Sequence, residues 1–217
     1  MRPAELGATR LFILRHGRSL ANERCIIVSR LDNGLLAEYA LAPAGLEQAA
    51  QAGAALLAWL SANGFAPGDV RIVASPFSRT VQTAQTAAAQ LSLGASVVRT
   101  DEALRERFFG DDLELRDHSL YEGVWKDDAA NPRSIPGGNG ESVVDVAARL
   151  EALLWRVISA EQPRVLLLVA HGDTLQILQA LLAQGEADAR DTHAAPDAEL
   201  ANHRQFALAT GELRLVV

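Results

Sequence analysis

Three short, largely apolar runs most constrain what this chain can fold into. They span residues 11–14, 71–74 and 165–169, and polar or charged residues follow each of them at once. Runs of this length with polar flanks are typical of strands buried on both faces of a parallel sheet. Longer segments with helix signals separate the three runs along the chain. This alternation predicts an α/β sandwich in which helices pack on the sheet.

Local start and stop signals predict further elements. Proline suits the first turn of a helix and Asn-Gly its end, so Pro43 and Asn63-Gly64 mark where one helix begins and ends. A closing hairpin is expected from residues 206–208 and 213–217, joined by a Thr-Gly turn. The patterns also predict helices over 80–91, 141–160 and 174–183, and one further, shorter strand over 96–99.

Composition narrows the class of protein. With 217 residues, 49% hydrophobic and 22% charged, the chain has the make-up of a single globular domain over 1–217. Its net charge of −7 disfavours nonspecific nucleic-acid binding, which needs a basic face. No apolar run reaches the length of a membrane span, and residues 1–5 lack the apolar region of a secretion signal. The single Cys25 excludes an intrachain disulfide, which fits a reducing compartment. Together these features lead us to expect a cytoplasmic protein without nucleic-acid or membrane partners.

Two segments show little regular pattern. Residues 23–40 are expected to form a loop that rises from the end of the first strand. Residues 101–140 are too long for an ordinary loop, so they are either functional or contain a missed element. We interpret them as a lid or insertion segment of the domain. Residues 111–140 contain seven acidic residues and three basic ones, which disfavours a ligand with several negative charges.

The residues that follow the three runs define a candidate site. Arg15-His16-Gly17 follow the first run, residues 75–79 the second and His171-Gly172 the third. If the runs are adjacent parallel strands, their carboxyl ends meet at one edge of the sheet, where open α/β sheets bind ligands. Two arginines and two histidines would then converge. Guanidinium groups hold phosphate oxygens and a neutral imidazole can attack phosphorus, so this grouping indicates phosphoryl transfer.

Each of these residues also has a plainer interpretation when taken alone. Arg79 would be a surface arginine beside a helix start, and His171 a hydrogen-bonded histidine at a strand end. Gly17 is expected to let backbone N–H groups approach an anion. The repeated placement of such residues at strand ends favours the shared functional interpretation.

Several motifs resemble one enzyme family. Arg15-His16-Gly17, with Asn22 six residues after the histidine, resembles the signature of the histidine phosphatase superfamily, the phosphoglycerate-mutase-like enzymes. The resemblance implies a three-layer α/β/α sandwich with a mostly parallel mixed sheet and one antiparallel strand. Four further segments resemble later motifs of that family and follow in the family's order, namely residues 75–84, 104–110, 138–142 and 169–172.

The same resemblance implies roles for individual residues. His16 would be the nucleophile that forms phosphohistidine, Arg15 and Arg79 would clamp the phosphate, and His171 would complete the pocket. Glu106 would protonate the leaving oxygen and later activate water. The partner would be a small phosphorylated substrate, with no cofactor and no metal. The resemblance also implies that Asn22, Ser19 and Gly172 contribute to substrate binding.

Three points stay open at this level. Glu102 and Asp111 are near enough in sequence to replace Glu106 as the proton donor. Arg18 stands where the family usually has Glu or Gln and adds a cation beside the pocket, while Leu41-Ala42 lacks the family's helix-capping hydroxyl. His118, His193 and His203 do not have the spacing of metal ligands, so no metal is implied.

Three functions compete. The first is a metal-independent phosphomonoester hydrolase that acts through phosphohistidine on His16. The second is a mutase that returns the phosphoryl group to its substrate. The third is a phospho-ligand binding module without turnover. The third is disfavoured because a binding module need not retain both a nucleophile and an acid, and the acidic 111–140 segment favours the first over the second.

Overall fold

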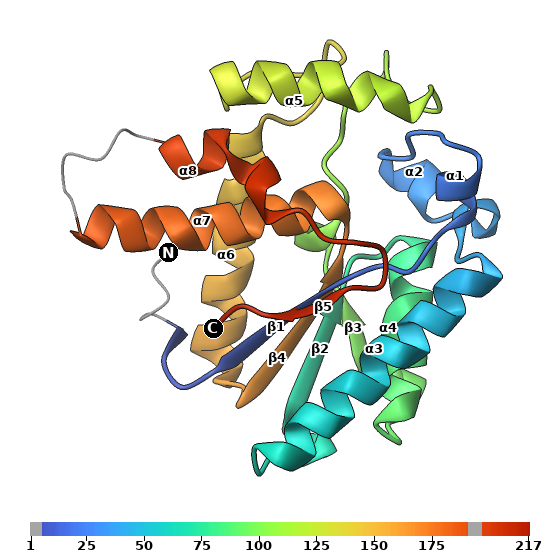
Figure 1. The fold of residues 1–217 in the computed structure, drawn as a ribbon, viewed down its shortest axis with the longest axis vertical. Helices are drawn as coiled ribbons and strands as arrows, with labels where there is room; N and C mark the ends of the chain where they lie inside the picture. The colour runs from blue at the N-terminus through green and yellow to red at the C-terminus, as the bar shows by residue number, and fades with distance from the viewer. Residues whose placement is uncertain (1–5, 191–196) are drawn as a thin grey trace.

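A five-stranded, mostly parallel sheet forms the centre of the structure (Figure 1). The computed structural model describes residues 6–190 and 197–217, so residues 1–5 and His193, both considered above, lie outside the described residues. The strand order is β3-β2-β4-β1-β5. The three predicted runs are β1 (Arg10–Arg15), β2 (Val70–Ala74) and β4 (Val165–Ala170). They are adjacent and parallel, β3 (Val98–Thr100) extends the parallel part, and β5 (Leu213–Leu215) is antiparallel to β1.

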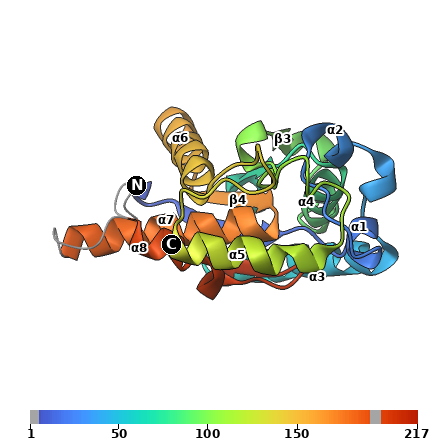
Figure 2. The same ribbon diagram turned by 90° about the horizontal axis from the view of Figure 1, so that it is seen from above.

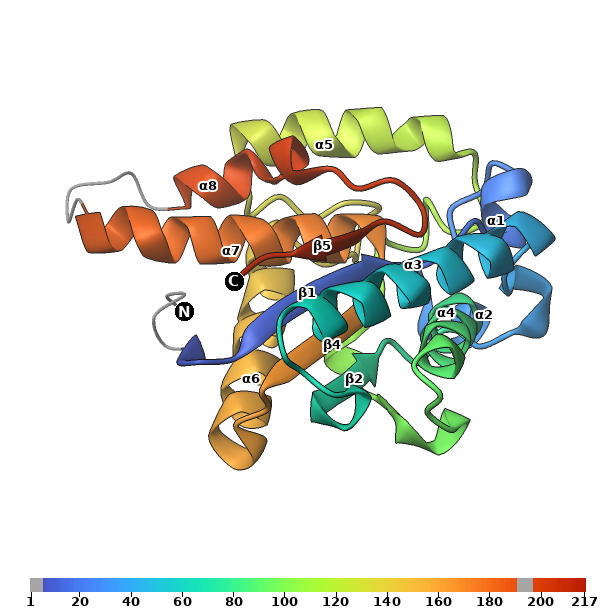
Figure 3. The ribbon, with the colours of Figure 1, turned by 60° about the horizontal axis from the view of Figure 1, so that its bottom comes forward.

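Two pairs of helices cover the two faces of the sheet, which confirms the three-layer α/β/α arrangement (Figure 3). α3 (Pro43–Ala62) and α4 (Ser78–Gln90) pack on one face, and α6 (Val143–Glu161) and α7 (Gly172–Arg190) on the other. Alternate side chains of a strand point to opposite faces. Leu11 and Ile13 of β1 therefore join the α6 and α7 core, whereas Phe12 and Leu14 join the α3 and α4 core.

Helix boundaries follow the chemistry of the chain. α3 begins at Pro43 after Ala42, whose methyl side chain cannot accept a hydrogen bond, so the predicted absence of a capping hydroxyl is confirmed. α6 begins after Ser142, which forms a reciprocal capping box with Asp145. Glu141, the residue before this cap, accepts a hydrogen bond from the backbone N–H of Phe108. The predicted 138–142 motif therefore supports the segment that contains Glu106.

The segment 101–140 contains a helix that periodicity did not predict. α5 (Tyr121–Ala130) lies above the two helical layers, at the end of the molecule where β1 leads toward α1 (Leu20–Glu23) (Figures 1 and 2). It buries Val124 and the charged Asp128 rather than an apolar stripe, so it has no helical hydrophobic pattern. Shorter turns of helix precede it at Glu102–Leu104 and His118–Leu120.

Residues 23–40 are less irregular than expected. They include α2 (Leu31–Gly34) and a 3-10 turn at Ala37–Tyr39, so Asn33 and Gly34 lie in a helical turn rather than in a loop turn. A helix of four residues gives no periodic signal, because one turn is too short to repeat. The segment was expected to rise from the end of the first strand toward the site, and Ile26 and Val28 do line the cavity described below.

The predicted closing hairpin is wrong in its first strand. Residue 206 ends a 3-10 turn at His203–Phe206 that follows α8 (Ala198–Ala201), and residues 206–208 form no ladder. The carbonyl of Leu208 accepts a hydrogen bond from Nη1 of Arg15 at 2.6 Å, and that of Ala207 accepts one from Nη2 of Arg214 at 3.0 Å. Side chains thus bind the carbonyls that a hairpin would use, and β5 pairs with β1 instead. Within the described ranges, no helix has the length and apolar character needed to span a bilayer.

Candidate active site at the carboxyl edge of the sheet

A cavity of about 240 Å³ lies at the carboxyl ends of the central strands. Seven of the eight predicted site residues line the cavity, namely Arg15, His16, Ser19, Asn22, Arg79, Glu106 and Gly172. The eighth, His171, does not line the cavity, but its ring centroid lies 5.2 Å from that of His16. The structure therefore brings together all the residues that the sequence predicted for the site.

The surroundings of His16 fix which of its nitrogens is free to react. Its Nδ1 lies 2.7 Å from the carbonyl oxygen of Gly17, which can only accept, so Nδ1 carries the proton. Its Nε2 accepts a hydrogen bond from Nε of Arg79 at 3.2 Å. Burial and the positive charge of Arg79 lower the pKa of His16 well below its usual value. The imidazole is therefore neutral, with its lone pair on Nε2.

Three buried nitrogens around His16 have no hydrogen-bond partner among the described residues: Nε of Arg15, Nη1 of Arg79 and Nδ1 of His171. Nη2 of Arg79 donates to the carbonyl of Val28 at 3.0 Å, so only part of that guanidinium is in use. Buried donors without partners are costly, and they are rare in folded proteins. Three such nitrogens around one imidazole match the donors that a bound oxyanion requires.

His171 is held by contacts behind the cavity. Its Nε2 lies 2.8 Å from Oγ of Ser75, and that hydroxyl also accepts from the backbone N–H of Phe77. If Ser75 donates to Nε2, Nδ1 carries the proton, on the side of the ring that faces Glu106. Burial and the charge of Arg79 lower the pKa of His171 well below its usual value, so the ring is neutral.

Glu106 has the environment of a proton donor. Its Oε1 accepts hydrogen bonds from the backbone N–H of Arg107 at 3.0 Å and from Oγ1 of Thr174 at 3.2 Å. Burial raises the pKa of Glu106 to about 7, an effect that the charge of Arg79 only partly offsets. The two alternative donors, Glu102 and Asp111, are exposed and do not line the cavity.

A second cavity carboxylate, Asp173, was missed by the sequence analysis. Burial alone would raise its pKa, but the hydrogen bond from His203 and the charge of Arg107 lower the pKa of Asp173 well below its usual value. Its Oδ1 accepts from Nε1 of Trp125 at 3.0 Å and lies 3.3 Å from Nε2 of His203. The cavity therefore contains one carboxyl group that can be neutral near pH 7 and one that stays ionised.

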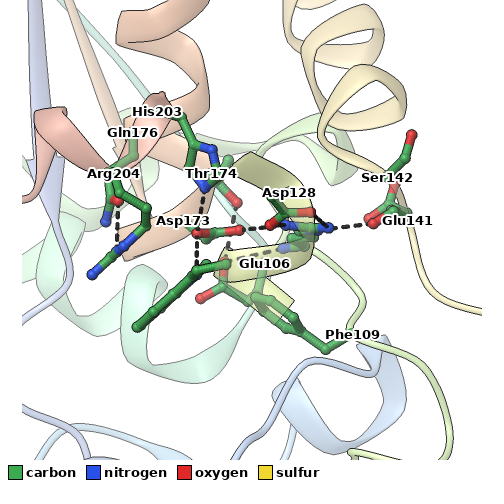
Figure 4. Close-up of polar contacts among 12 residues, drawn as sticks. Glu106, Phe109, Asp128, Glu141, Ser142, Asp173, Thr174, Gln176, His203 and Arg204 are labelled. Carbon is green, nitrogen blue, oxygen red and sulfur yellow. Dashed lines mark hydrogen bonds and ion pairs between the residues drawn. The ribbon is translucent and has the colours of Figure 1, made fainter. Parts of the chain in front are cut away.

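Asp173 belongs to a buried ionic network (Figure 4). Nη1 of Arg107 lies 3.2 Å from Oδ2 of Asp173 and 2.6 Å from Oδ2 of Asp128, and Nη2 of Arg107 donates to the other oxygen of Asp128 at 2.8 Å. Asp128 belongs to α5 and Arg107 follows Glu106 directly. The network thus connects α5 to the backbone that supports the candidate acid. The position of Asp173 next to the His171-Gly172 motif is the signal that could have revealed it.

Two glycines of the site, Gly17 and Gly172, allow their neighbours to pack closely. The N–H of Gly17 donates to Oγ1 of Thr83 at 3.1 Å, so it is not available to an anion. A Cβ at Gly17 would lie 2.2 Å from the carbonyl oxygen of Gly45, which means that the glycine allows close packing against the start of α3. The expected anion-binding role of the Gly17 turn is therefore wrong. A Cβ at Gly172 would lie 3.2 Å from Cζ of Arg15, so glycine leaves space for that guanidinium.

Ser19 and Asn22 are hydrogen-bonded to each other. The backbone N–H and the hydroxyl of Ser19 donate to Oδ1 of Asn22 at 3.0 and 2.9 Å. This capping box at α1 leaves Nδ2 of Asn22, which has no partner among the described residues, as a donor on the cavity wall. Arg18 does not line the cavity: it is half-exposed, and its Nε lies 3.7 Å from Glu23. The expected extra cation beside the pocket is thus directed elsewhere.

None of the acidic residues of 111–140 lines the cavity. Asp128 is paired with Arg107, Asp111 with Arg30, and Glu114 accepts from the backbone of Ser29. The excess of negative charge in this segment therefore does not face a bound ligand. An unpredicted cation, Arg204, lines the wall instead. Within the described ranges, no group of three or more metal-ligating side chains occurs.

Comparisons with known proteins give consistent matches. The family model of the histidine phosphatase superfamily (branch 1) matches residues 11–205. A protein of Hydrogenobacter thermophilus named as a phosphoserine phosphatase is 33% identical over 177 residues, which are 80% of this chain and 78% of that protein. A 2,3-bisphosphoglycerate-dependent phosphoglycerate mutase of Parvibaculum lavamentivorans is 30% identical over 179 residues, 77% of each chain. The structure of a mycobacterial glucosyl-3-phosphoglycerate phosphatase in complex with VO3 is 27% identical, with a TM-score of 0.67, over 94% of this chain and 90% of that one.

Proposed function

Because the chain belongs to the histidine phosphatase superfamily, branch 1, we propose that it hydrolyses small phosphomonoesters through a phosphohistidine intermediate on His16. Homologues and structural neighbours of the chain are named phosphatases. The observation that carries the proposal is that three buried nitrogens without partners, on Arg15, Arg79 and His171, belong to side chains that surround His16. These donors supply the charge and hydrogen bonds that a phosphoryl group requires.

In the first step, the phosphoryl oxygens of the substrate bind to Arg15, Arg79 and His171. Nε2 of His16 attacks phosphorus with its lone pair, the bond between phosphorus and the ester oxygen breaks, and a phosphorus–nitrogen bond forms. Glu106, which its pKa of about 7 allows to be protonated, gives its proton to the leaving oxygen, so that the alcohol departs neutral.

In the second step, Glu106 is a carboxylate and accepts a proton from a water molecule. The oxygen of that water attacks phosphorus, the phosphorus–nitrogen bond breaks, and inorganic phosphate leaves. His16 recovers its neutral form and Glu106 its proton, so the cycle closes without any other reactant. We further infer that residues 101–140 act as a lid within a single domain, because Tyr121 and Trp125 of α5 line the cavity.

A mutase remains the second candidate, because one relative of similar identity is a phosphoglycerate mutase. The repulsion argument against it is weaker than the sequence suggested, since the acidic residues of 111–140 do not line the cavity. Incubation with 3-phosphoglycerate and a trace of 2,3-bisphosphoglycerate separates the two. A phosphatase releases inorganic phosphate faster than 2-phosphoglycerate appears, and a mutase shows the opposite order.

The test of the proposal is to trap the intermediate. The enzyme is mixed with para-nitrophenyl phosphate in the presence of EDTA and quenched in alkali, which preserves phosphohistidine. Peptide mass spectrometry is expected to find a phosphate adduct on His16. Because the exposed His118 also lines the cavity, the spectrum must place the adduct on the peptide that contains His16 and not on the peptide that contains His118. Turnover without an adduct on His16 would overturn the proposal.

A further inference from the structure

Arg204 is a cation in the cavity wall that the mechanism above does not use. It lies in the turn at His203–Phe206, and its Cζ is 3.5 Å from the ring centroid of Trp125 in α5. Its Nη1 donates to Oε1 of Gln176 in α7 at 2.6 Å (Figure 4). Gln176 is itself only 2% exposed. Stacking on the indole fixes the plane of the guanidinium, and the buried amide fixes its rotation, so the group is held ready for a ligand.

Arg204 has no ion-pair partner among the described residues. Among residues 6–190 and 197–217, no carboxylate forms an ion pair with it, in contrast to Arg107 and Arg105. Asp173, on the same wall, already binds Trp125, His203 and Arg107. Burial lowers the pKa of Arg204, and the negative charge of Asp173 offsets this only in part, which agrees with a cation partly removed from water without an ion-pair partner. An anionic ligand would supply the missing partner.

The free edge of this guanidinium has a defined geometry. Because Nη1 is bound to Gln176, the edge formed by Nε and Nη2 remains, and neither nitrogen has a hydrogen bond within the described part of the chain. Two parallel N–H groups on one edge match the two oxygens of a carboxylate. We propose that Arg204 binds a carboxylate of the substrate, and that the substrates are therefore phosphate esters of small hydroxy acids. This inference rests on the proposed function.

The balance of charge favours a carboxylate over a second phosphate. Three arginines line the cavity in the described ranges, and two of them, Arg15 and Arg79, are committed to the reacting phosphate. One remaining guanidinium matches a group with a single negative charge better than a dianion. The cavity volume of about 240 Å³ also suits a small hydroxy-acid ester, since drug-sized ligands occupy larger pockets.

The experiment compares two esters that differ at one carbon. 3-Phosphoglycerate has a carboxylate where glycerol 3-phosphate has a hydroxymethyl group, and the phosphate ester is otherwise alike. We expect the wild-type enzyme to prefer 3-phosphoglycerate in kcat/KM by about 10- to 100-fold, the range for a hydrogen-bonded charged contact. Arg204→Gln should bring this preference close to unity, mainly through KM. Arg204→Lys, which retains the charge but loses the paired edge, should give an intermediate preference.

Controls separate this inference from the proposed function. Arg18→Gln makes the same change in charge at an exposed site outside the cavity and should leave the preference unchanged. Inhibition by vanadate reports the phosphate pocket and should be similar in wild type and Arg204→Gln. Arg204 would be only structural if Arg204→Gln lowered kcat/KM equally for both esters. The same would follow if the variant weakened inhibition by vanadate as strongly as it lowered kcat/KM for 3-phosphoglycerate.

Two other outcomes would also overturn the inference. A wild type that hydrolyses both esters equally, or that prefers 2,3-bisphosphoglycerate to both, would exclude a single carboxylate as the second group. If neither ester is hydrolysed but a phosphate adduct still forms on His16, the substrate class is wrong and the proposed function stands. If no adduct forms either, the proposed function fails as well.

Discussion

Nδ1 of His171 lies 3.9 Å from Oε2 of Glu106, and both side chains are buried beside the cavity. The distance is too long for a hydrogen bond, so the two groups face one another but neither is the hydrogen-bond partner of the other. A neutral imidazole and a protonated carboxyl group can tolerate this arrangement because neither has a charge. The same two groups can donate to oxygens of a phosphate ester placed between the arginines, which is why their pKa values matter for the chemistry.

The first prediction concerns the nucleophile. His16→Ala should lower kcat for para-nitrophenyl phosphate by about 10⁴-fold or more, because the variant lacks the proposed nucleophile. The variant should still be inhibited by, or bind, vanadate through Arg15, Arg79 and His171. Thermal unfolding serves as the control for folding. A folded variant with near wild-type turnover would contradict the assignment.

The second prediction concerns the acid. Glu106→Gln should lower kcat for an alkyl phosphate by about 10²- to 10⁴-fold, because an alkoxide needs a proton to leave. The loss should be much smaller for para-nitrophenyl phosphate, whose leaving group is stable without one. Glu102→Gln, at an exposed position nearby, is the matched control. Equal losses on the two substrates would assign Glu106 a binding or structural role instead.

The third prediction is the pH dependence of kcat/KM for an alkyl phosphate. Glu106 must be protonated to act as the acid, and its pKa is about 7, so activity should fall as the pH rises through about 7. On the acidic side, activity should persist well below pH 6.5, because the pKa of His16 is lowered and the nucleophile stays neutral. The basic limb should disappear in the residual activity of Glu106→Gln. A basic limb that survives in that variant would have another origin.

The fourth prediction concerns the attachment of α5. Asp128→Asn removes one charge of a fully buried ion pair with Arg107 and should lower the free energy of unfolding by about 3 kcal/mol. Asp127→Asn, one residue away on the exposed side of the same helix, should change it by less than about 0.5 kcal/mol. Urea unfolding followed by circular dichroism measures both. Equal stabilities of the two variants would show that the network does not hold α5.

Local patterns were sufficient for the sheet and for the core of the site. The runs at β1, β2 and β4 are continuous and apolar because those strands are buried on both faces, and such runs are visible without any knowledge of the fold. The residues that follow them had to meet once the strands were parallel and adjacent. That is why His16, Arg79 and His171 could be named from sequence.

Elements that depend on long-range partners could not be predicted in the same way. α5 buries a charged residue, Asp128, whose partner Arg107 lies 21 residues earlier in the chain, so it has no apolar periodicity to detect. Residues 206–208 have a strand-like composition, but Arg15, 193 residues away from Leu208, binds its carbonyl. In both cases a distant side chain, rather than local propensity, determines the structure.

The sequence by itself determined which segments are buried strands and which chemical groups follow them, because both depend on contiguous residues. Only the tertiary structure decided which carboxyl group is the candidate acid, since burial alone distinguishes Glu106 from the exposed Glu102 and Asp111. It also decided that the acidic residues of 111–140 do not line the cavity and that Arg204 does. The physical reason is that burial, charge pairing and pKa depend on neighbours in space, which come from distant parts of the chain.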